Sequence, residues 1–134
     1  MTKPKKPSPQ RAAAKARAQE LLSELDESFV SNDDVRAVET TLYTIASNLA
    51  VLVLSHKMKV AEPLGEILRV AAQTVNDKKA RRRLRKLATI SDELEAYADK
   101  SRYDGLEDSD IEAANELREA LHDGLDEWIN SVQV

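Results

Sequence analysis

Residues 41–54 read Thr-Leu-Tyr-Thr-Ile-Ala-Ser-Asn-Leu-Ala-Val-Leu-Val-Leu, which is the most apolar stretch of the chain. Wound as an α-helix, this stretch has no clean polar face, and a helix that is apolar on all sides is normally buried. It is shorter than the roughly 20 apolar residues that cross a bilayer, and Thr44, Ser47 and Asn48 interrupt it. It therefore predicts the central helix of a soluble bundle without membrane contact.

The composition favours an all-α protein. Residues that favour helices, such as Ala, Leu, Glu, Lys and Arg, are abundant, whereas the chain has three Gly and four Pro. A chain of 134 residues has room for one ordinary hydrophobic core. We expect a compact bundle of roughly four to five helices around a central helix at about 34–58. The bundle should form a single domain over 10–134, after a disordered basic tail at 1–9.

Apolar residues at helical spacing predict the other helices. The first should run over about 10–28, and its alanine-rich first half, which offers little to a core, should project or fray. Ser31-Asn-Asp-Asp34 supplies capping oxygens for the central helix, and Pro63 fits the first turn of a third helix. The fourth is expected at about 77–102, unless it forms one bent helix with the third. Ser109-Asp-Ile-Glu112 matches the capping box that starts a last helix.

Residues suited to catalysis or metal binding are scarce. The chain has no cysteine and only two histidines, His56 and His122, and it carries no Gly-rich phosphate loop. Glu119-Ala-Leu-His122 resembles the Glu-x-x-His element of di-iron bundles, but the second such element is missing. We therefore expect no enzymatic activity, no metal site and no cofactor.

The net charge of −4 conceals a strong segregation of charge. Residues 1–18 carry cations and no acid, whereas residues 104–134 are acidic with Arg118 as the sole base. Between these ends lies a dense group of cations, called here the basic cluster. It consists of Lys78, Lys79, Arg81, Arg82, Arg83, Arg85 and Lys86.

Several interpretations of the basic cluster compete. At the start of a helix these cations would oppose the helix dipole and repel one another, so helix stability does not account for them. They can bind nucleic-acid phosphates, pair with the acidic last helix of this chain or of a second copy, or form a solvated face. They would also suit the end of a third helix that continued to Arg81. We favour phosphate binding.

Only part of the basic cluster can face one ligand, because the cations surround most of a helix. Leu84 and Leu87 define the buried direction. The exposed stripe should therefore consist of Lys78, Arg82, Arg85 and Lys86, with Lys79 and Arg83 beside it.

The basic tail agrees with phosphate binding. Its Lys-Pro-Lys-Lys-Pro-Ser-Pro run and the Ala/Lys/Arg stretch after it resemble the tails of linker histones and bacterial histone-like proteins, a low-complexity likeness that assigns no family. No zinc finger, KH loop or RNA-recognition motif is present, and the aromatic residues mostly fall on core faces. We therefore expect the protein to contact the phosphate backbone of the nucleic acid and to distinguish little between base sequences. The tail adds Lys5, Lys6, Arg11, Lys15 and Arg17 to the expected nucleic-acid-binding residues.

The acidic last helix offers an alternative function. Its carboxylates resemble those of magnesium-dependent nucleotide hydrolases in spacing, but they lie on one helix, whereas Mg²⁺ bound to phosphates wants carboxylates from separate helices. They could instead dock on a basic protein surface, as nucleic-acid mimics encoded by phages do, or form a solvated face. The candidate protein-binding residues are Glu112, Glu116, Glu119, Asp123, Asp126 and Glu127.

The sequence thus predicts a non-catalytic, cytoplasmic helical protein that binds nucleic-acid backbone with weak or no sequence specificity. It would act alone, as a homo-oligomer or with the protein subunits of a nucleoprotein assembly, and it has the size and character of the small helical subunits of CRISPR effector complexes. The alternative is a protein-binding adaptor or inhibitor that acts through its acidic last helix.

Overall fold

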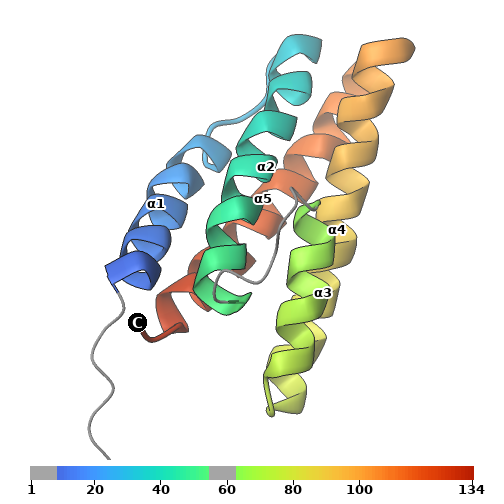
Figure 1. The fold of residues 1–134 in the computed structure, drawn as a ribbon. Helices are drawn as coiled ribbons and strands as arrows, with labels where there is room; N and C mark the ends of the chain where they lie inside the picture. Colours follow the sequence, from blue (N-terminus) through green and yellow to red (C-terminus); the bar gives the residue numbers. More distant parts are fainter. Residues whose placement is uncertain (1–8, 55–62) are drawn as a thin grey trace, which may run out of the picture.

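The computed structural model describes residues 9–54 and 63–134, which form five α-helices (Figure 1). In chain order these are α1 (Pro9–Leu25), α2 (Asn32–Leu54), α3 (Leu64–Thr74), α4 (Lys78–Tyr103) and α5 (Asp108–Ser131). No strand occurs within the described ranges. The prediction of an all-α bundle is therefore confirmed. Residues 1–8 of the predicted tail at 1–9, the predicted end of the central helix at 55–58, and His56 lie outside the described residues, whereas Pro9 begins α1.

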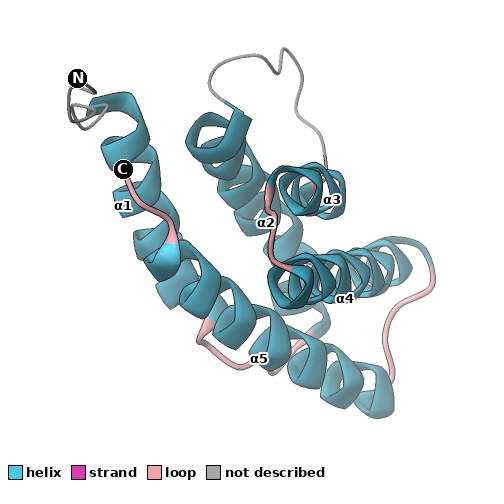
Figure 2. Cartoon of the chain, turned by 90° about the horizontal axis from the view of Figure 1, so that it is seen from below, coloured by secondary structure: helices cyan, strands magenta, loops and turns pink. Residues whose placement is uncertain are grey.

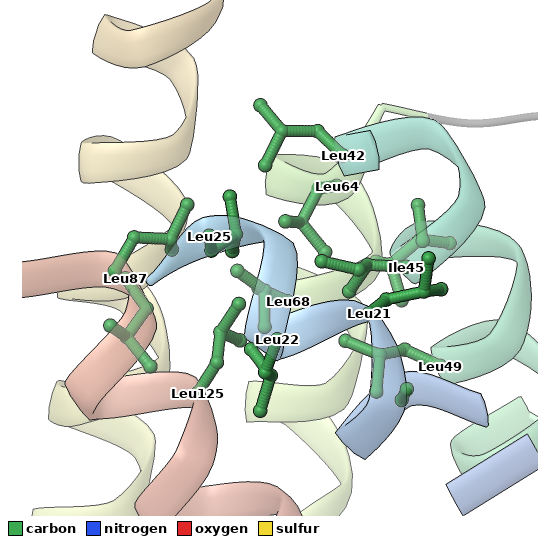
Figure 3. Packing of buried hydrophobic residues seen from close by; sticks show 14 of the residues in the cluster. Leu21, Leu22, Leu25, Leu42, Ile45, Leu49, Leu64, Leu68, Leu87 and Leu125 are labelled. Atoms are coloured by element: carbon green, nitrogen blue, oxygen red, sulfur yellow. The ribbon is translucent and has the colours of Figure 1, made fainter. Parts of the chain in front are cut away.

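Helix α2 is the central helix, because it contacts each of the other four. In Figure 1, α1 lies on one side of α2 and the hairpin of α3 and α4 lies on the other. Helix α5 contacts α1, α2 and α4, and Figure 2 shows it running along one side of the bundle. Leu42, Ile45 and Leu49 of α2 are fully buried among leucines from the surrounding helices (Figure 3).

One face of α2 is exposed, so the expectation of a helix buried on every side is wrong. Tyr43 is 39% exposed and Ser47 is also exposed. Ser47 Oγ donates to the Tyr43 carbonyl at 3.1 Å, and Asn48 Nδ2 donates to the Thr44 carbonyl at 2.8 Å. These polar side chains are satisfied by the helix's own backbone and need no partner from another helix. By length and composition alone α2 could span a membrane, but its buried residues pack against the other helices.

The first half of α1 packs against the bundle instead of projecting as predicted. Ala14 and Ala18 are buried. Arg11 Nε lies 2.9 Å from the Leu52 carbonyl in the last turn of α2, and Lys15 Nζ lies 2.7 Å from the Val132 carbonyl at the end of α5. Small side chains let α1 approach closely, and cations suit the unpaired carbonyls at helix ends. The start of α1 is therefore held beside the carboxyl end of the chain.

Helices α3 and α4 are separate helices. Val75 has an extended backbone, and Asp77 caps α4 by accepting a hydrogen bond from the Lys79 amide at 3.3 Å. This geometry excludes one bent helix and a third helix that continues to Arg81. Pro63 lies at the cap position before α3, one residue earlier than the predicted first turn.

The predicted residues 31–34 cap α2, and their capping is reciprocal, whereas the capping box of α5 lies at other residues than predicted. Ser31 Oγ accepts a hydrogen bond from the Asp34 amide at 3.2 Å, and Asp34 Oδ2 accepts one from the Ser31 amide at 3.1 Å. At α5 the capping box joins Glu107 and Asp110, so the predicted box at Ser109-Asp-Ile-Glu112 is wrong.

The capping box lies at Glu107 and Asp110 because Lys100 of α4 binds Asp110. This lysine belongs to another helix and is therefore absent from the sequence pattern at the start of α5. Lys100 Nζ lies 2.9 Å from Asp110 Oδ2, the same oxygen that accepts from the Glu107 amide at 3.0 Å. These two hydrogen bonds lower the pKa of the Asp110 carboxyl and stabilise its ionised form at the start of α5.

A buried polar contact joins α5 to the end of α1. Arg118 is 6% exposed, and its Nη1 donates to the Leu25 carbonyl in the last turn of α1. Its Nε donates to Asn115 Oδ1 at 3.2 Å, and its guanidinium lies 5.8 Å from the centre of the Phe29 ring. Helix α1 ends at Leu25, earlier than the predicted residue 28. At this end Arg118 donates a hydrogen bond to the Leu25 carbonyl, which has no partner within the helix.

Candidate nucleic-acid interface

The basic cluster forms the first turns of α4, at the tip of the α3–α4 hairpin. In Figure 1 this tip lies at the lower end of the molecule and extends beyond the ends of α2 and α5. Leu84 and Leu87 are buried and belong to the hydrophobic core. They direct the opposite side of these turns towards solvent.

Most of the basic cluster is exposed and has no acidic partner within the described ranges. The exposed members without an ion pair there are Lys78, Lys79, Arg82, Arg85 and Lys86, which include the whole predicted exposed stripe. Arg83 Nη1 lies 2.6 Å from Glu127 Oε1 of α5, and both side chains are 68% exposed. Arg81 is half-buried and turns back to the Asn76 carbonyl at 3.4 Å. Pairing with the acidic helix of the same chain therefore accounts for one cation.

A groove runs between the basic cluster and the second half of α5. Its volume is about 470 Å³. The apolar lining includes Leu84, Leu87, Ile90 and Trp128, and the polar lining includes Lys79, Arg83, Lys86 and Glu127. Gly124 of α5 faces Leu87, and a Cβ atom at residue 124 would lie 2.3 Å from Leu87 Cδ2. The glycine therefore allows the two helices that form the groove to approach closely.

The candidate residues of the basic tail are placed differently. Lys5 and Lys6 lie outside the described residues. Arg11 and Lys15 donate to the Leu52 and Val132 carbonyls, and Arg17 forms an exposed ion pair with Glu20 at 3.2 Å. The starts of α1 and α4 lie at the same end of the bundle in Figure 1, but on opposite sides of α2 and α5. The structure does not bring the described tail cations next to the basic cluster.

The acidic residues of α5 form one exposed stripe along the helix. Every candidate protein-binding residue on it is exposed: Glu112, Glu116, Glu119, Asp123, Asp126 and Glu127. His122 Nδ1 lies 3.0 Å from Asp123 Oδ1. In the described part of the chain, no group of three or more His, Asp or Glu side chains is arranged to hold a metal ion.

A second electrostatic cluster lies on α4 away from the groove. Glu95 is half-buried, and burial together with the nearby carboxylates of Asp92, Glu39 and Asp99 raises the pKa of its carboxyl. Its carboxyl accepts a hydrogen bond from the Leu64 amide at the start of α3, which opposes the shift. Arg69 of α3 forms an ion pair with Asp92 of α4. These contacts hold α3 against α4 and stabilise the hairpin that carries the basic cluster.

The geometry defines a five-helix bundle with an exposed cationic hairpin tip, an adjacent apolar groove and an acidic last helix. The chain matches no protein family, no curated protein and no solved structure at a significant level. Its function must therefore be inferred from how these residues are arranged.

Proposed function

We propose that the protein binds the phosphate backbone of nucleic acid through the first turns of α4, with weak or no sequence specificity. The observation that carries the proposal is the set of exposed cations at the hairpin tip that lack an acidic partner in the described residues. Cations at the start of a helix oppose its dipole, and their mutual repulsion adds to that cost. Phosphates would offset both effects and release counterions on binding.

The test is a charge reversal on the exposed stripe. The double variant R82E/R85E should keep the helical circular dichroism spectrum, because both side chains are exposed. It should weaken binding to unrelated sequences about equally. The slope of log affinity against log salt should fall by about 0.7 to 0.9 for each phosphate that the variant no longer neutralises.

A matched control separates local contact from overall charge. Arg36 on α2 is exposed like Arg82, and R36E changes the net charge by the same amount as R82E. R82E should weaken binding more than R36E. If the parent does not bind nucleic acid at low salt, or if R82E and R36E behave alike, the basic cluster is not the interface.

Deletion of residues 1–8 tests the rest of the basic tail without removing Arg11 or Lys15, whose contacts hold α1 in place. The shortened protein should bind more weakly than the parent, with a smaller loss than the double variant shows. An equal affinity would remove the tail from the proposal and leave the basic cluster in it.

A protein-binding role is the second candidate, and the exposed acidic stripe of α5 favours it. A pulldown from the native host, with nuclease treatment of half of the sample, distinguishes the two functions. Partners that vanish with nuclease support nucleic-acid binding. Partners that persist with nuclease and no longer bind the charge reversal E116K/E119K support docking through α5.

A further inference from the structure

The groove beside the basic cluster is a feature of the candidate interface that phosphate binding does not explain. Its volume of about 470 Å³ falls within the range of roughly 300–1,000 Å³ typical of small-ligand sites. The apolar part of its lining, called here the floor, includes Leu84, Leu87 and Ile90 from α4 and Trp128 from α5. A phosphate gains nothing from such a floor, whereas a flat, weakly polar ring system would be favoured there.

Trp128 gives the groove an aromatic wall next to the cations. Trp128 is half-buried, whereas Leu125 and Ile129, its neighbours among the apolar residues of α5, are fully buried. Lys79, Arg83 and Lys86 line the same groove from α4. An indole ring with cations beside it is the combination that proteins use to stack a base while holding its phosphates.

We propose that the nucleic acid is single-stranded and that one of its bases stacks against Trp128 in the groove. This inference rests on the proposed function of the basic cluster. A single strand presents unpaired bases, whereas a duplex must unstack and unpair a base before it can enter a pocket. Lys79 and Lys86 bind the phosphates that flank the inserted base. Base stacking is tolerant of sequence, in agreement with the weak or absent sequence specificity of the proposed function.

The positive surface continues beyond the groove, which favours a nucleic acid over an acidic protein segment as occupant. Lys78, Arg82 and Arg85 belong to the exposed cluster but do not line the groove. The ligand therefore needs negative charges that run on past its apolar group. A nucleic-acid strand has this regular alternation of charge and flat ring, whereas an acidic peptide would place its charges around a single apolar side chain.

Trp128 is the only tryptophan of the chain, so its fluorescence reports on the groove directly. The experiment adds a mixed-sequence single strand, the duplex of the same sequence and inorganic polyphosphate to the full chain, and measures fluorescence and affinity at low salt. The single strand should quench the fluorescence strongly. Duplex and polyphosphate should bind without comparable quenching.

Substitutions test the same contact independently. W128L should weaken single-strand binding by about 5- to 150-fold, the loss expected for one stacked base, and leave polyphosphate binding unchanged. W128F should retain most of the affinity. Y103L is the matched control, because Tyr103 is an exposed aromatic residue at the other end of α4. If W128L fails to fold, the fluorescence quenching of the parent and the single-strand affinity of W128F decide whether a base stacks on Trp128.

The outcomes separate the two proposals. Failure of every polyanion to bind would overturn the proposed function together with this inference. Binding of single strand and duplex with equal affinity, without quenching, would overturn the inference and leave the proposed function intact. An acidic peptide with large apolar side chains is the remaining probe. If this peptide quenches the Trp128 fluorescence and the single strand does not, the groove belongs to a protein partner and the inference is overturned.

Discussion

The buried contact of Arg118 offers the sharpest test of how the bundle is held together. Arg118 reaches from α5 to the Leu25 carbonyl at the end of α1, and it is 6% exposed. Replacing it with Met keeps a side chain of similar length and removes every hydrogen bond of the guanidinium. Replacing it with Ala removes the packing of the apolar stem as well.

The expected loss of stability follows from the groups that remain. A buried carbonyl without a partner costs about 1–3 kcal/mol, and the loss of a cation at the end of a helix costs about 0.3–2 kcal/mol. Release from the cost of burying a charge offsets part of this. R118M should therefore unfold about 1–3 kcal/mol more easily than the parent, and R118A should lose somewhat more.

Urea unfolding followed by circular dichroism measures these differences. R17A is the control, because Arg17 forms an exposed pair with Glu20 that should contribute less than about 1 kcal/mol. If R118M equals or exceeds the parent in stability, the cost of burying the guanidinium outweighs its hydrogen bonds. The reasoning about the end of α1 would then be wrong.

Three further predictions concern the core, the hairpin and the response to pH. L49A should lose about 2–5 kcal/mol of stability in urea unfolding, because the leucine is fully buried on the central helix. G65A should lower the melting temperature of the parent, since its new Cβ atom would overlap the Asp92 carboxylate and would lie 3.2 Å from the backbone oxygen of Ala88. E95Q should be more stable than the parent in thermal unfolding at neutral pH, where the carboxylate with the raised pKa is ionised. The gain in stability of E95Q should disappear as the pH falls through that raised pKa to the ordinary range of a glutamate. The Glu95 carboxyl of the parent is then protonated in both the folded and the unfolded protein.

The helices were predictable because their leucines repeat at helical spacing. Leu42, Ile45 and Leu49 lie on one face of α2, and that periodicity alone places them in a core. The start of α5 was not predictable, because two overlapping capping patterns exist there and Lys100 of another helix selects between them. Likewise, the alanines of α1 indicate helix but do not show that α2 and α5 will cover them.

The candidate interface was predictable only in its charges. The direction of Leu84 and Leu87 was enough to place Arg82 and Arg85 on the exposed side of α4. The groove was not predictable from charge, because it depends on how closely α5 approaches α4. Gly124 was the available signal, since a glycine within an apolar stripe often marks a close approach of two helices.

The contact between α1 and the end of α5 has a consequence for the folding rate. Arg11 Nη2 donates to the Gln133 carbonyl at 2.9 Å, so formation of this contact closes a loop that contains almost the whole chain. Contacts between residues distant in sequence slow folding. A circular permutant that joins residue 134 to residue 9 through a short linker and opens the chain at Gly105 would convert α5 and α1 into a local hairpin. It should keep the same bundle, because α5 would still pack against both α1 and α4.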